Sequence, residues 1–371
     1  MKTEIKILQI GMTHNVGGME SYLMSQYRHL KKVKYDFLNI TGEKEIAFRE
    51  EIEKQSKIYS VPTRHLHPLK HYWAMFILFL KIHKQYDGVV LNTCDLSYMF
   101  PLLLAKIFRV PMRIIHSHNA GNEMRMSFAR RRLMQLNKFI MNKSVNGRWA
   151  CSNIAGKFMF GNKKYEVICN AIDVNKFLFN ENIREKYRKK LDLENKFVLG
   201  NVARFSYQKN HGFLIKVFYE IQKKYPESVL LLVGAFDKDD EYYLNIMDLI
   251  KKYRIINKVF FLGPRSDVSD LYQAMDCLVM PSLFEGLCIS AIEAQAAGLP
   301  CVCSNGLPDE AEITDIFHRL DLSDSINKWA DLILSYKNKK REDMRESIRI
   351  AGYDIDNQID RVENMFVTRC I

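Results

Sequence analysis

Residues Pro281–Pro300 have the sequence PSLFEGLCISAIEAQAAGLP and follow the apolar run Cys277–Met280. Four apolar residues that end at a proline are typical of a strand buried on both faces of a parallel sheet. The small and apolar residues over Leu287–Ala297 predict a helix, which Gly298 and Pro300 end. The stretch therefore predicts a strand, a short loop and a helix in direct succession.

The loop carries Glu285 and Gly286, and Glu293 follows with seven residues between the two glutamates. Free backbone N–H groups at the positive start of a helix suit a phosphate or a pyrophosphate. A fully helical interval would separate the glutamates by about 12 Å, and a turn at Gly286 would shorten it. We therefore expect the two carboxylates at two ends of one extended ligand. The alternative is a solvated loop glutamate and a helix glutamate that only caps or pairs.

The length and charge of the chain limit the number of its domains and the classes of its partners. Its 371 residues predict two domains of about 150 to 200 residues each. Residues 1–175 contain 27 Lys and Arg against 13 Asp and Glu, whereas residues 176–371 contain 28 against 30. The first half is therefore expected to face an anionic partner, such as a membrane surface, a lipid phosphate or a nucleic acid. Nucleic acid is disfavoured, because no nucleic-acid-binding module is recognised and stacking aromatics do not alternate with the basic residues.

Cysteine usage and hydropathy indicate the compartment. The eight cysteines lie mostly in apolar runs without a C-x-x-C pair, which is typical of buried thiols in a reducing compartment. The most apolar window, Tyr72–Leu80, has nine residues, against about 20 that span a bilayer. The opening residues, MKTEIKILQIG, lack the cleavage site of a signal peptide. We expect a cytosolic protein whose membrane contact is peripheral.

Both halves alternate strands with helices, which predicts parallel α/β layers. Strands are predicted at residues 5–10, 35–40, 58–60, 88–91, 112–116, 145–151, 165–169, 197–203, 229–233, 258–262 and 277–280. Helices are predicted between them, at residues 19–30, 44–55, 71–85, 98–108, 123–143, 212–224, 241–253 and 287–297. The boundary is placed near residue 175, where no Gly/Ser linker occurs, so we expect two halves coupled about a hinge.

Two polar motifs of the first half follow strands, at the strand ends where α/β sheets hold ligands. Gly17 and Gly18 open a helix, so backbone N–H groups there could approach a phosphate or a sugar; an ordinary tight turn is the alternative. His116 and His118 stand at the end of a strand. We expect their rings on opposite sides of the extended segment, so that one faces a ligand, the other packs, and no metal is shared.

The predicted helix at residues 123–143 carries six Lys and Arg against one glutamate. A basic amphipathic helix can lie on an anionic membrane surface. The alternative is a helix that packs on the core and leaves its basic face solvated.

Arg204 and Lys209 lie in the loop after the first strand of the second half. A guanidinium and an ammonium together suit a pyrophosphate, although such a pair can also be ordinary surface charge. The acidic run Asp237–Asp240 is expected to be a loop between a strand and a helix rather than a metal site.

Several motifs together resemble a known family. The segments FEGLCISAIE, NVARFSYQKN, VICNAIDVNKF and NVGGME are similar, in this order from the second half to the first, to motifs of the retaining GT-B glycosyltransferases of glycosyltransferase family 4. The segments IIHSHNAGNE and SNGLPDEAEIT resemble the branch that builds bacterial exopolysaccharide and capsule repeat units. The resemblance covers nearly the whole chain. Ala171 departs from a common glycine, and the loop Asn305–Glu310 departs from a double-glycine loop, so no role is carried over to Glu310.

The resemblance implies two Rossmann-like domains that face a central cleft. Residues 1–175 would form the acceptor-side domain and residues 176–354 the nucleotide-sugar-binding domain. A C-terminal helix at about residues 355–369 would pack back onto the first domain. The implied activity is transfer of a sugar from a nucleotide-sugar, a UDP-sugar, to a polyprenyl-diphosphate-linked saccharide.

The resemblance also implies roles for the motif residues of the second half. Arg204 and Lys209 would neutralise the donor pyrophosphate and the leaving nucleotide. Glu285 would contact the donor sugar, and Glu293 would hold the ribose hydroxyls. Backbone N–H groups at the phosphates would come from Gly286, Leu287 and Cys288.

In the first half, Gly17 and Gly18 would allow close approach to the donor, and His118, rather than His116, would contact its sugar. Members of this group usually work without a metal, so the resemblance implies neither a metal nor another cofactor. The enzyme would be cytoplasmic and peripheral to the inner face of the cell membrane. Two alternatives stay open: a UDP-sugar 2-epimerase of the same fold, and a non-catalytic scaffold of polysaccharide assembly.

Overall fold

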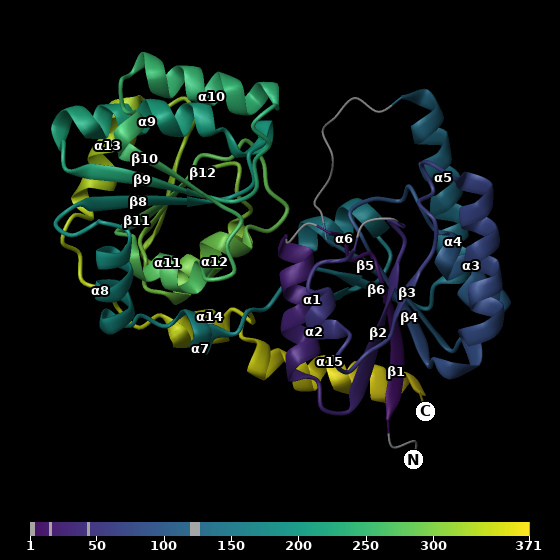
Figure 1. Ribbon diagram of the computed structural model, residues 1–371. Helices are drawn as coiled ribbons and strands as arrows, with labels where there is room; N and C mark the ends of the chain where they lie inside the picture. Colours follow the sequence, from purple (N-terminus) through teal and green to yellow (C-terminus); the bar gives the residue numbers. More distant parts are fainter. Residues whose placement is uncertain (1–3, 15–16, 43–44, 119–126, 371) are drawn as a thin grey trace. The chain divides into compact units, whose positions relative to one another are not determined.

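A computed structural model describes residues 4–14, 17–42, 45–118 and 127–370 of the chain (Figure 1). The chain divides into two compact units, Met1–Ile172 with Asp354–Ile371, and Asp173–Tyr353. Each unit holds one parallel sheet and its own buried apolar core. The parallel α/β layers predicted from the alternation of strands and helices are confirmed, and so are the two Rossmann-like domains that the resemblance implies.

The first unit has a seven-stranded sheet in the order β3-β2-β1-β4-β5-β6-β7. Its strands are β1 (Ile5–Ile10), β2 (Val33–Asn39), β3 (Ile58–Ser60), β4 (Gly88–Thr93), β5 (Met112–Ser117), β6 (Gly147–Ala150) and β7 (Glu166–Val167). Its helices are α1 (Gly18–His29), α2 (Arg49–Ile52), α3 (Pro68–Ile82), α4 (Phe100–Ile107), α5 (Phe128–Ser144), α6 (Asn153–Phe160) and α15 (Ile355–Cys370). Within the described ranges, no helix combines the length and the hydropathy that a bilayer crossing needs.

The second unit has a six-stranded sheet in the order β10-β9-β8-β11-β12-β13. Its strands are β8 (Phe197–Val202), β9 (Ser228–Val233), β10 (Val259–Gly263), β11 (Cys277–Met280), β12 (Cys301–Ser304) and β13 (Phe317–Leu320). Its helices are α7 (Val174–Phe177), α8 (Glu181–Lys190), α9 (His211–Lys224), α10 (Glu241–Lys252), α11 (Val268–Ala274), α12 (Ile289–Ala296), α13 (Ile326–Ser335) and α14 (Arg345–Ile350). β11 lies in the middle of the sheet and is fully buried, as its apolar sequence predicts.

The last helix, α15, returns to the first unit. It packs against α1, and its Val362 and Phe366 belong to the same buried core as Tyr35 and Trp149. The buried carboxylate of Glu363 accepts the backbone N–H groups of residues 31 and 32, both at 2.6 Å. These contacts satisfy N–H groups just after α1 and fix the C-terminal segment to the first unit.

Three predicted elements differ from the structure. The helix predicted at residues 44–55 is reduced to α2, because Phe48 adopts the left-handed conformation (φ 61°) immediately before it. The helix predicted from residue 123 is described only from Phe128, and residues 119–126 lie outside the described ranges. The helix predicted from Leu287 begins at Ile289, so the loop before α12 is longer than expected.

Candidate functional site

Two loops of the second unit meet where the neighbouring parallel strands β8 and β11 end. The backbone N–H of Leu283 donates to the carbonyl of Gln208 at 2.8 Å. The Gln208 side chain donates to the carbonyl of Phe284 at 2.8 Å and to Glu285 Oε2 at 3.1 Å. The ammonium of Lys209 donates to Glu285 Oε1 at 2.6 Å. The sheet register thus brings together two motifs that lie 76 residues apart in the sequence.

The Lys209–Glu285 ion pair is largely removed from solvent, with exposed side-chain fractions of 17% and 6%. Burial alone would lower the pKa of the Lys209 ammonium, but the charge of Glu285 and its hydrogen bond raise this pKa above its usual value. Lys209 therefore stays cationic, and both carboxylate oxygens of Glu285 already accept hydrogen bonds. Arg204 is exposed in the same loop. Its positive charge repels that of Lys209 and acts to lower the pKa of Lys209. Among the described residues no acidic partner is recorded for the Arg204 guanidinium.

The start of α12 leaves backbone donors available beside this pair. Within the described part of the chain, no acceptor is recorded for the N–H groups of Gly286, Leu287, Ile289 and Ser290. The Cys288 side chain caps no N–H, and burial raises the pKa of its thiol to about 12, so the thiol stays neutral. The predicted contribution of Gly286, Leu287 and Cys288 is thus restricted to their backbone. Unpaired N–H groups at a helix start form an anion-binding surface.

A close approach of backbone holds the loop after β11 in place. A side chain at Gly306 would put its Cβ 2.3 Å from the carbonyl oxygen of Ser282 and 2.6 Å from that of Leu283. We expect Gly306→Ala to lower the free energy of unfolding by about 1–3 kcal/mol, because backbone atoms would have to shift. Urea unfolding measures this change. Gly212→Ala on α9 is the control: the nearest atom lies 3.7 Å from its Cβ, so a gain of about 0.5–1 kcal/mol is expected.

Glu293 lies half-buried on α12. Burial raises the pKa of its carboxyl to about 7, while the Tyr272 hydroxyl, which donates to Glu293 Oε2 at 2.9 Å, and the charge of Lys176 lower it. Burial removes water from the carboxylate, and no cation is recorded in contact with it among the described residues. Such a group is well placed to accept hydrogen bonds from hydroxyl groups of a ligand.

In the first unit, Gly17 and Gly18 lie at the start of α1, as predicted. Gly17 is the N-cap residue, and Glu20 Oε1 accepts the backbone N–H of Thr13 at 3.1 Å and its hydroxyl at 2.8 Å. A Cβ at Gly17 would lie 3.0 Å from the other Glu20 oxygen. The glycine therefore leaves room for the carboxylate that fastens the loop after β1.

The expectation that the rings of His116 and His118 lie on opposite sides of the segment was wrong. Their ring centroids lie 4.0 Å apart, and both rings contact Tyr22, at 5.7 and 6.0 Å between centroids. Residues i and i+2 of an extended segment point to the same side, since side chains alternate with a period of two. The two histidines therefore form one cluster at the end of β5.

Within this cluster only His118 is partly accessible, whereas His116 is buried. Burial lowers the pKa of His118 to about 3 and that of His116 well below its usual value, where the neighbouring imidazole also contributes. Both rings are neutral at physiological pH. His118 Nε2 lies 3.0 Å from Asn92 Oδ1, and Asn92 in turn donates to Gln9, at 2.9 Å. A neutral, oriented His118 can hydrogen-bond a hydroxyl but supplies no charge.

The acidic run Asp237–Asp240 is a loop, as expected. Asp237 accepts the backbone N–H of Asp239 at 3.0 Å, and Asp240 caps α10 by accepting the N–H of Tyr242 at 2.7 Å. No group of three or more His, Cys, Asp and Glu side chains arranged for a metal ion occurs in the described residues.

Sequence reasoning missed three polar residues that hydrogen-bond to the predicted site residues: Gln208, Tyr272 and Asn92. Gln208 and Tyr272 hydrogen-bond Glu285 and Glu293, respectively, and Asn92 orients His118. Gln208 stands beside Lys209 in the sequence, so its position in the loop was the one available signal. Tyr272 lies on α11, a helix that the pattern did not predict.

Comparison with known proteins connects this geometry to a family. The sequence pattern of the family described as glycosyl transferases group 1 matches residues 183–353, nearly the whole second unit. The second unit is a glycosyl transferases group 1 domain. The loop pair that carries Lys209 and Glu285 and the helix that carries Glu293 lie inside it.

Relatives of this glycosyltransferase extend over the full chain. A putative glycosyltransferase EpsF of Bacillus subtilis is 28% identical over 375 residues, which cover 97% of this chain and 96% of that protein. A UDP-Gal:alpha-D-GlcNAc-diphosphoundecaprenol alpha-1,3-galactosyltransferase of Escherichia coli is 23% identical over 98% of this chain and 97% of that protein. Both units thus have counterparts in glycosyltransferases of similar length.

Solved structures show the same GT-B fold. Anabaena Alr3699/HepE in complex with UDP and glucose has a TM-score of 0.80 and 20% identity, and covers 98% of this chain and 100% of that chain. WaaG, a glycosyltransferase involved in lipopolysaccharide biosynthesis, has a TM-score of 0.69 and 15% identity, with 95% of both chains covered.

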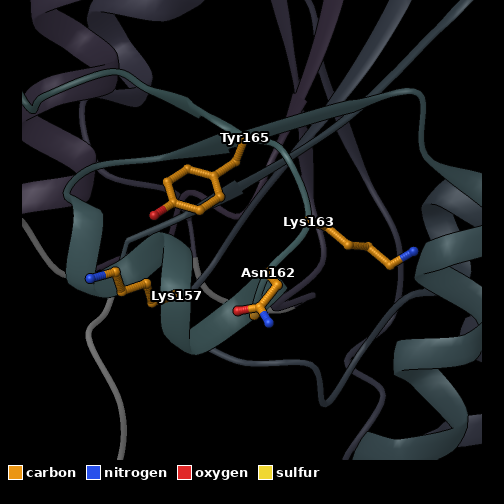
Figure 2. A pocket seen from close by; sticks show the side chains of 5 residues that line it. Lys157, Asn162, Lys163 and Tyr165 are labelled. Atoms are coloured by element: carbon orange, nitrogen blue, oxygen red, sulfur yellow. The ribbon is translucent and has the colours of Figure 1, made fainter.

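An open recess of about 470 Å³ lies on the first unit of the glycosyltransferase, at the end of α6 (Figure 2). It is lined by Lys157, Gly161, Asn162, Lys163 and Tyr165. Figure 2 shows Lys163 directed away from Tyr165. None of the predicted site residues lines this recess.

Proposed function

We propose that the protein is a retaining glycosyltransferase that transfers a sugar from a UDP-sugar to a lipid-linked saccharide. The proposal includes a role in bacterial exopolysaccharide or capsule biosynthesis. The observation that carries it is the buried Lys209–Glu285 ion pair beside the start of α12. A fixed cation, an exposed arginine and unpaired N–H groups gather there within a group 1 glycosyl transferases domain.

The proposed roles follow from charge and hydrogen-bonding capacity. Lys209 uses one of its N–H donors on Glu285, which leaves donors for a diphosphate oxygen. Arg204 adds a second cation. No acidic partner is recorded for it among the described residues, so a diphosphate would not have to displace one. The N–H groups of Gly286 and Leu287 would bind phosphate oxygens, and Glu285 would accept hydroxyl groups of the donor sugar. These groups supply the electrostatic stabilisation that a departing diphosphate requires, so we propose that no metal takes part.

In the proposed reaction, the bond between the anomeric carbon and the diphosphate oxygen breaks, and its electron pair leaves with the nucleotide. The acceptor oxygen bonds to the anomeric carbon on the same face, and its proton passes to the departing phosphate. Both oxygens of Glu285 are engaged by Lys209 and Gln208, which argues against Glu285 as a covalent nucleophile. For the first unit, we propose that His118 contacts the donor sugar, and that Gly17 and Gly18 allow the close approach.

The acceptor and the membrane contact form the second part of the proposal. The galactosyltransferase relative is named for a diphosphoundecaprenol substrate, and another relative for amylovoran biosynthesis, with 28% identity over 61% of both chains. Five of the 17 residues of α5 are Lys or Arg, and none is acidic. We propose that this basic helix meets the anionic inner face of the cell membrane, where a lipid-linked acceptor would lie.

Calorimetry with candidate donors in the presence of a chelator tests the function. UDP and at least one UDP-sugar should bind, and the product formed on a synthetic lipid-diphosphate acceptor should keep the anomeric configuration of the donor in NMR spectra. Release of a free 2-epimer without acceptor would favour the epimerase. Wild-type protein that binds no nucleotide would refute the transferase and favour the scaffold.

Arg204→Ala should weaken UDP binding by about 10- to 100-fold, since a charge-assisted contact to the diphosphate is lost. Because Arg204 is exposed, the melting temperature should not change. Calorimetry with UDP and with uridine measures the effect, and uridine binding should stay the same. Lys186→Ala, an exposed cation of α8, is the control and should bind UDP like the wild type. Equal losses for uridine and UDP would contradict a diphosphate contact.

A further inference from the structure

Exposed large apolar side chains concentrate on the first unit. Of the 17 such residues in the described ranges, 13 lie between residues 66 and 158. Six of them belong to α3 or the residues just before it: Leu66, Leu69, Tyr72, Trp73, Phe76 and Leu80. Soluble proteins rarely expose apolar side chains in such a group unless the group takes part in an interaction.

Helix α3 is apolar on two opposite faces. One face is buried against the unit through Met75, Phe79 and Ile82. Residues at spacings of three and four form the other face, where Leu69 is 85% and Trp73 66% exposed. Packing in the unit explains the first face but leaves the second without a function.

Helix α5 carries a second exposed apolar row. Leu133, Leu136 and Phe139 follow at intervals of three residues, and all are exposed. Helix α4 contacts both α3 and α5, and the three helices lie on one side of the sheet (Figure 1). The ring of Phe108, just after α4, lies 5.6 Å from that of Phe76 on α3. The two exposed rows thus lie on helices that flank α4, and together they are here called the α3–α5 face.

The charge around the α3–α5 face is strongly positive. Residues 61–144 contain 13 Lys and Arg against three Asp and Glu. Of these acids, Asp87 is buried against the N–H of Lys6, and Asp95 is paired with Arg130 at 2.9 Å. A second copy of this face would repel it, whereas an anionic surface would complement it.

We propose that the α3–α5 face inserts into an anionic lipid bilayer, with α3 lying in the plane of the interface. This inference rests on the proposed membrane association and assigns its apolar anchor to α3, the helix of the apolar window 72–80. A 15-residue helix is about 22 Å long, which suits an interfacial helix and not a crossing one. Leu69, Trp73 and Leu80 would enter the boundary of the acyl chains, while Lys70 and Lys81 contact the lipid phosphates.

Tryptophan fluorescence tests the insertion directly. Trp149 and Trp329 are buried, so Trp73 is the one tryptophan that solvent and lipid can reach. Vesicles of phosphatidylglycerol and phosphatidylcholine should shift the emission to shorter wavelength, and brominated acyl chains should quench it. Trp73→Phe should abolish the quenching. Quenching that persists in Trp73→Phe, or binding without any quenching, would overturn insertion through α3.

Matched variants test the affinity by co-sedimentation. Leu69→Ser with Leu80→Ser should weaken binding to the mixed vesicles about tenfold or more. The control, Leu244→Ser with Ile350→Ser, removes two similarly exposed apolar residues of the second unit and should leave vesicle binding unchanged. Replacing Lys70, Lys81 and Lys84 by glutamine should weaken binding about 100-fold, and pure phosphatidylcholine vesicles should bind weakly.

UDP calorimetry on the same variants separates this inference from the donor proposal. Unchanged UDP binding with lost vesicle binding is expected for the α3 variants. Wild-type protein that binds UDP but no vesicles would overturn the inference and leave donor binding in place. Sedimentation equilibrium without lipid tests the alternative. If it detects a dimer, and if Leu69→Ser with Leu80→Ser dissociates this dimer, the face would be assigned to a second copy instead.

Discussion

Replacing Lys209 by alanine is expected to lower kcat by about 10²- to 10³-fold, the effect of removing one preorganised group that stabilises developing negative charge. The Lys209 ammonium is held by Glu285 at 2.6 Å and stays charged, so no reorganisation is needed when charge builds on the departing diphosphate. Steady-state kinetics with a saturating UDP-sugar measures the change. Lys223→Ala is the matched control, because Lys223 pairs with Glu220 at 2.7 Å on an exposed surface. It should leave kcat unchanged.

A loss of folding would imitate a loss of catalysis, so stability must be measured beside it. Lys209→Ala leaves Glu285 buried without its cation, which costs on the order of 3–5 kcal/mol. The double variant Lys209→Met, Glu285→Gln removes both charges at similar volume and should restore much of the stability but none of the activity. A Lys209→Ala protein that is folded and retains kcat within threefold would refute the proposed role of this ammonium.

The elements that sequence predicted best are those with a strong local signal. The buried strand β11 and the glycine that ends the helix after it were predicted closely, because an apolar run and Gly298, which adopts a φ of 62°, depend on few neighbours. The four-residue strands β12 and β13 were not predicted, since each is too short to carry a periodic pattern of its own. Short strands owe their existence to the sheet around them.

The predictions of the site were likewise best where the sequence signal is local. Loops at strand ends predicted Arg204, Lys209 and Glu285, and the spacing of the two glutamates predicted Glu293 on the following helix. These signals did not show which of the side chains would be in contact. The ion pair between Lys209 and Glu285 depends on β8 and β11 being neighbours, a fact of sheet order that no local motif contains. The error over the two histidines had a different origin, since the period of a strand was applied wrongly to residues two apart.

Glu293→Gln is expected to weaken UDP binding about tenfold or more, while it stabilises the protein at alkaline pH. The lost affinity is that of charge-assisted hydrogen bonds from the ribose hydroxyls. UDP and 2′,3′-dideoxy-UDP, compared by calorimetry, measure it. The wild type should prefer UDP, and the variant should lose most of this preference. A preference that survives in Glu293→Gln would mean that another group holds the ribose.

The stability change follows from the pKa of Glu293, which burial raises from 4.5 to about 7. Between these values the native state binds more protons than the unfolded state, so stability falls as pH rises through this window. The wild type should therefore lose on the order of 2 kcal/mol between pH 4.5 and 8 that Glu293→Gln does not lose. Buried neutral histidines act in the opposite direction, but they are common to both proteins and cancel in the difference.

Thermal unfolding of the two proteins at pH 5 and pH 8 tests this sign. The melting temperature of Glu293→Gln should exceed that of the wild type at pH 8 and approach it at pH 5. Glu346→Gln, which removes an exposed carboxylate, should match the wild type at both values. If Glu293→Gln is the less stable protein at pH 8, the wild-type carboxylate is a structural group whose hydrogen bonds are satisfied within the protein. If it is the more stable one, the wild-type carboxylate destabilises the protein in the absence of ligand, as expected of a group whose hydrogen-bond partners belong to a ligand.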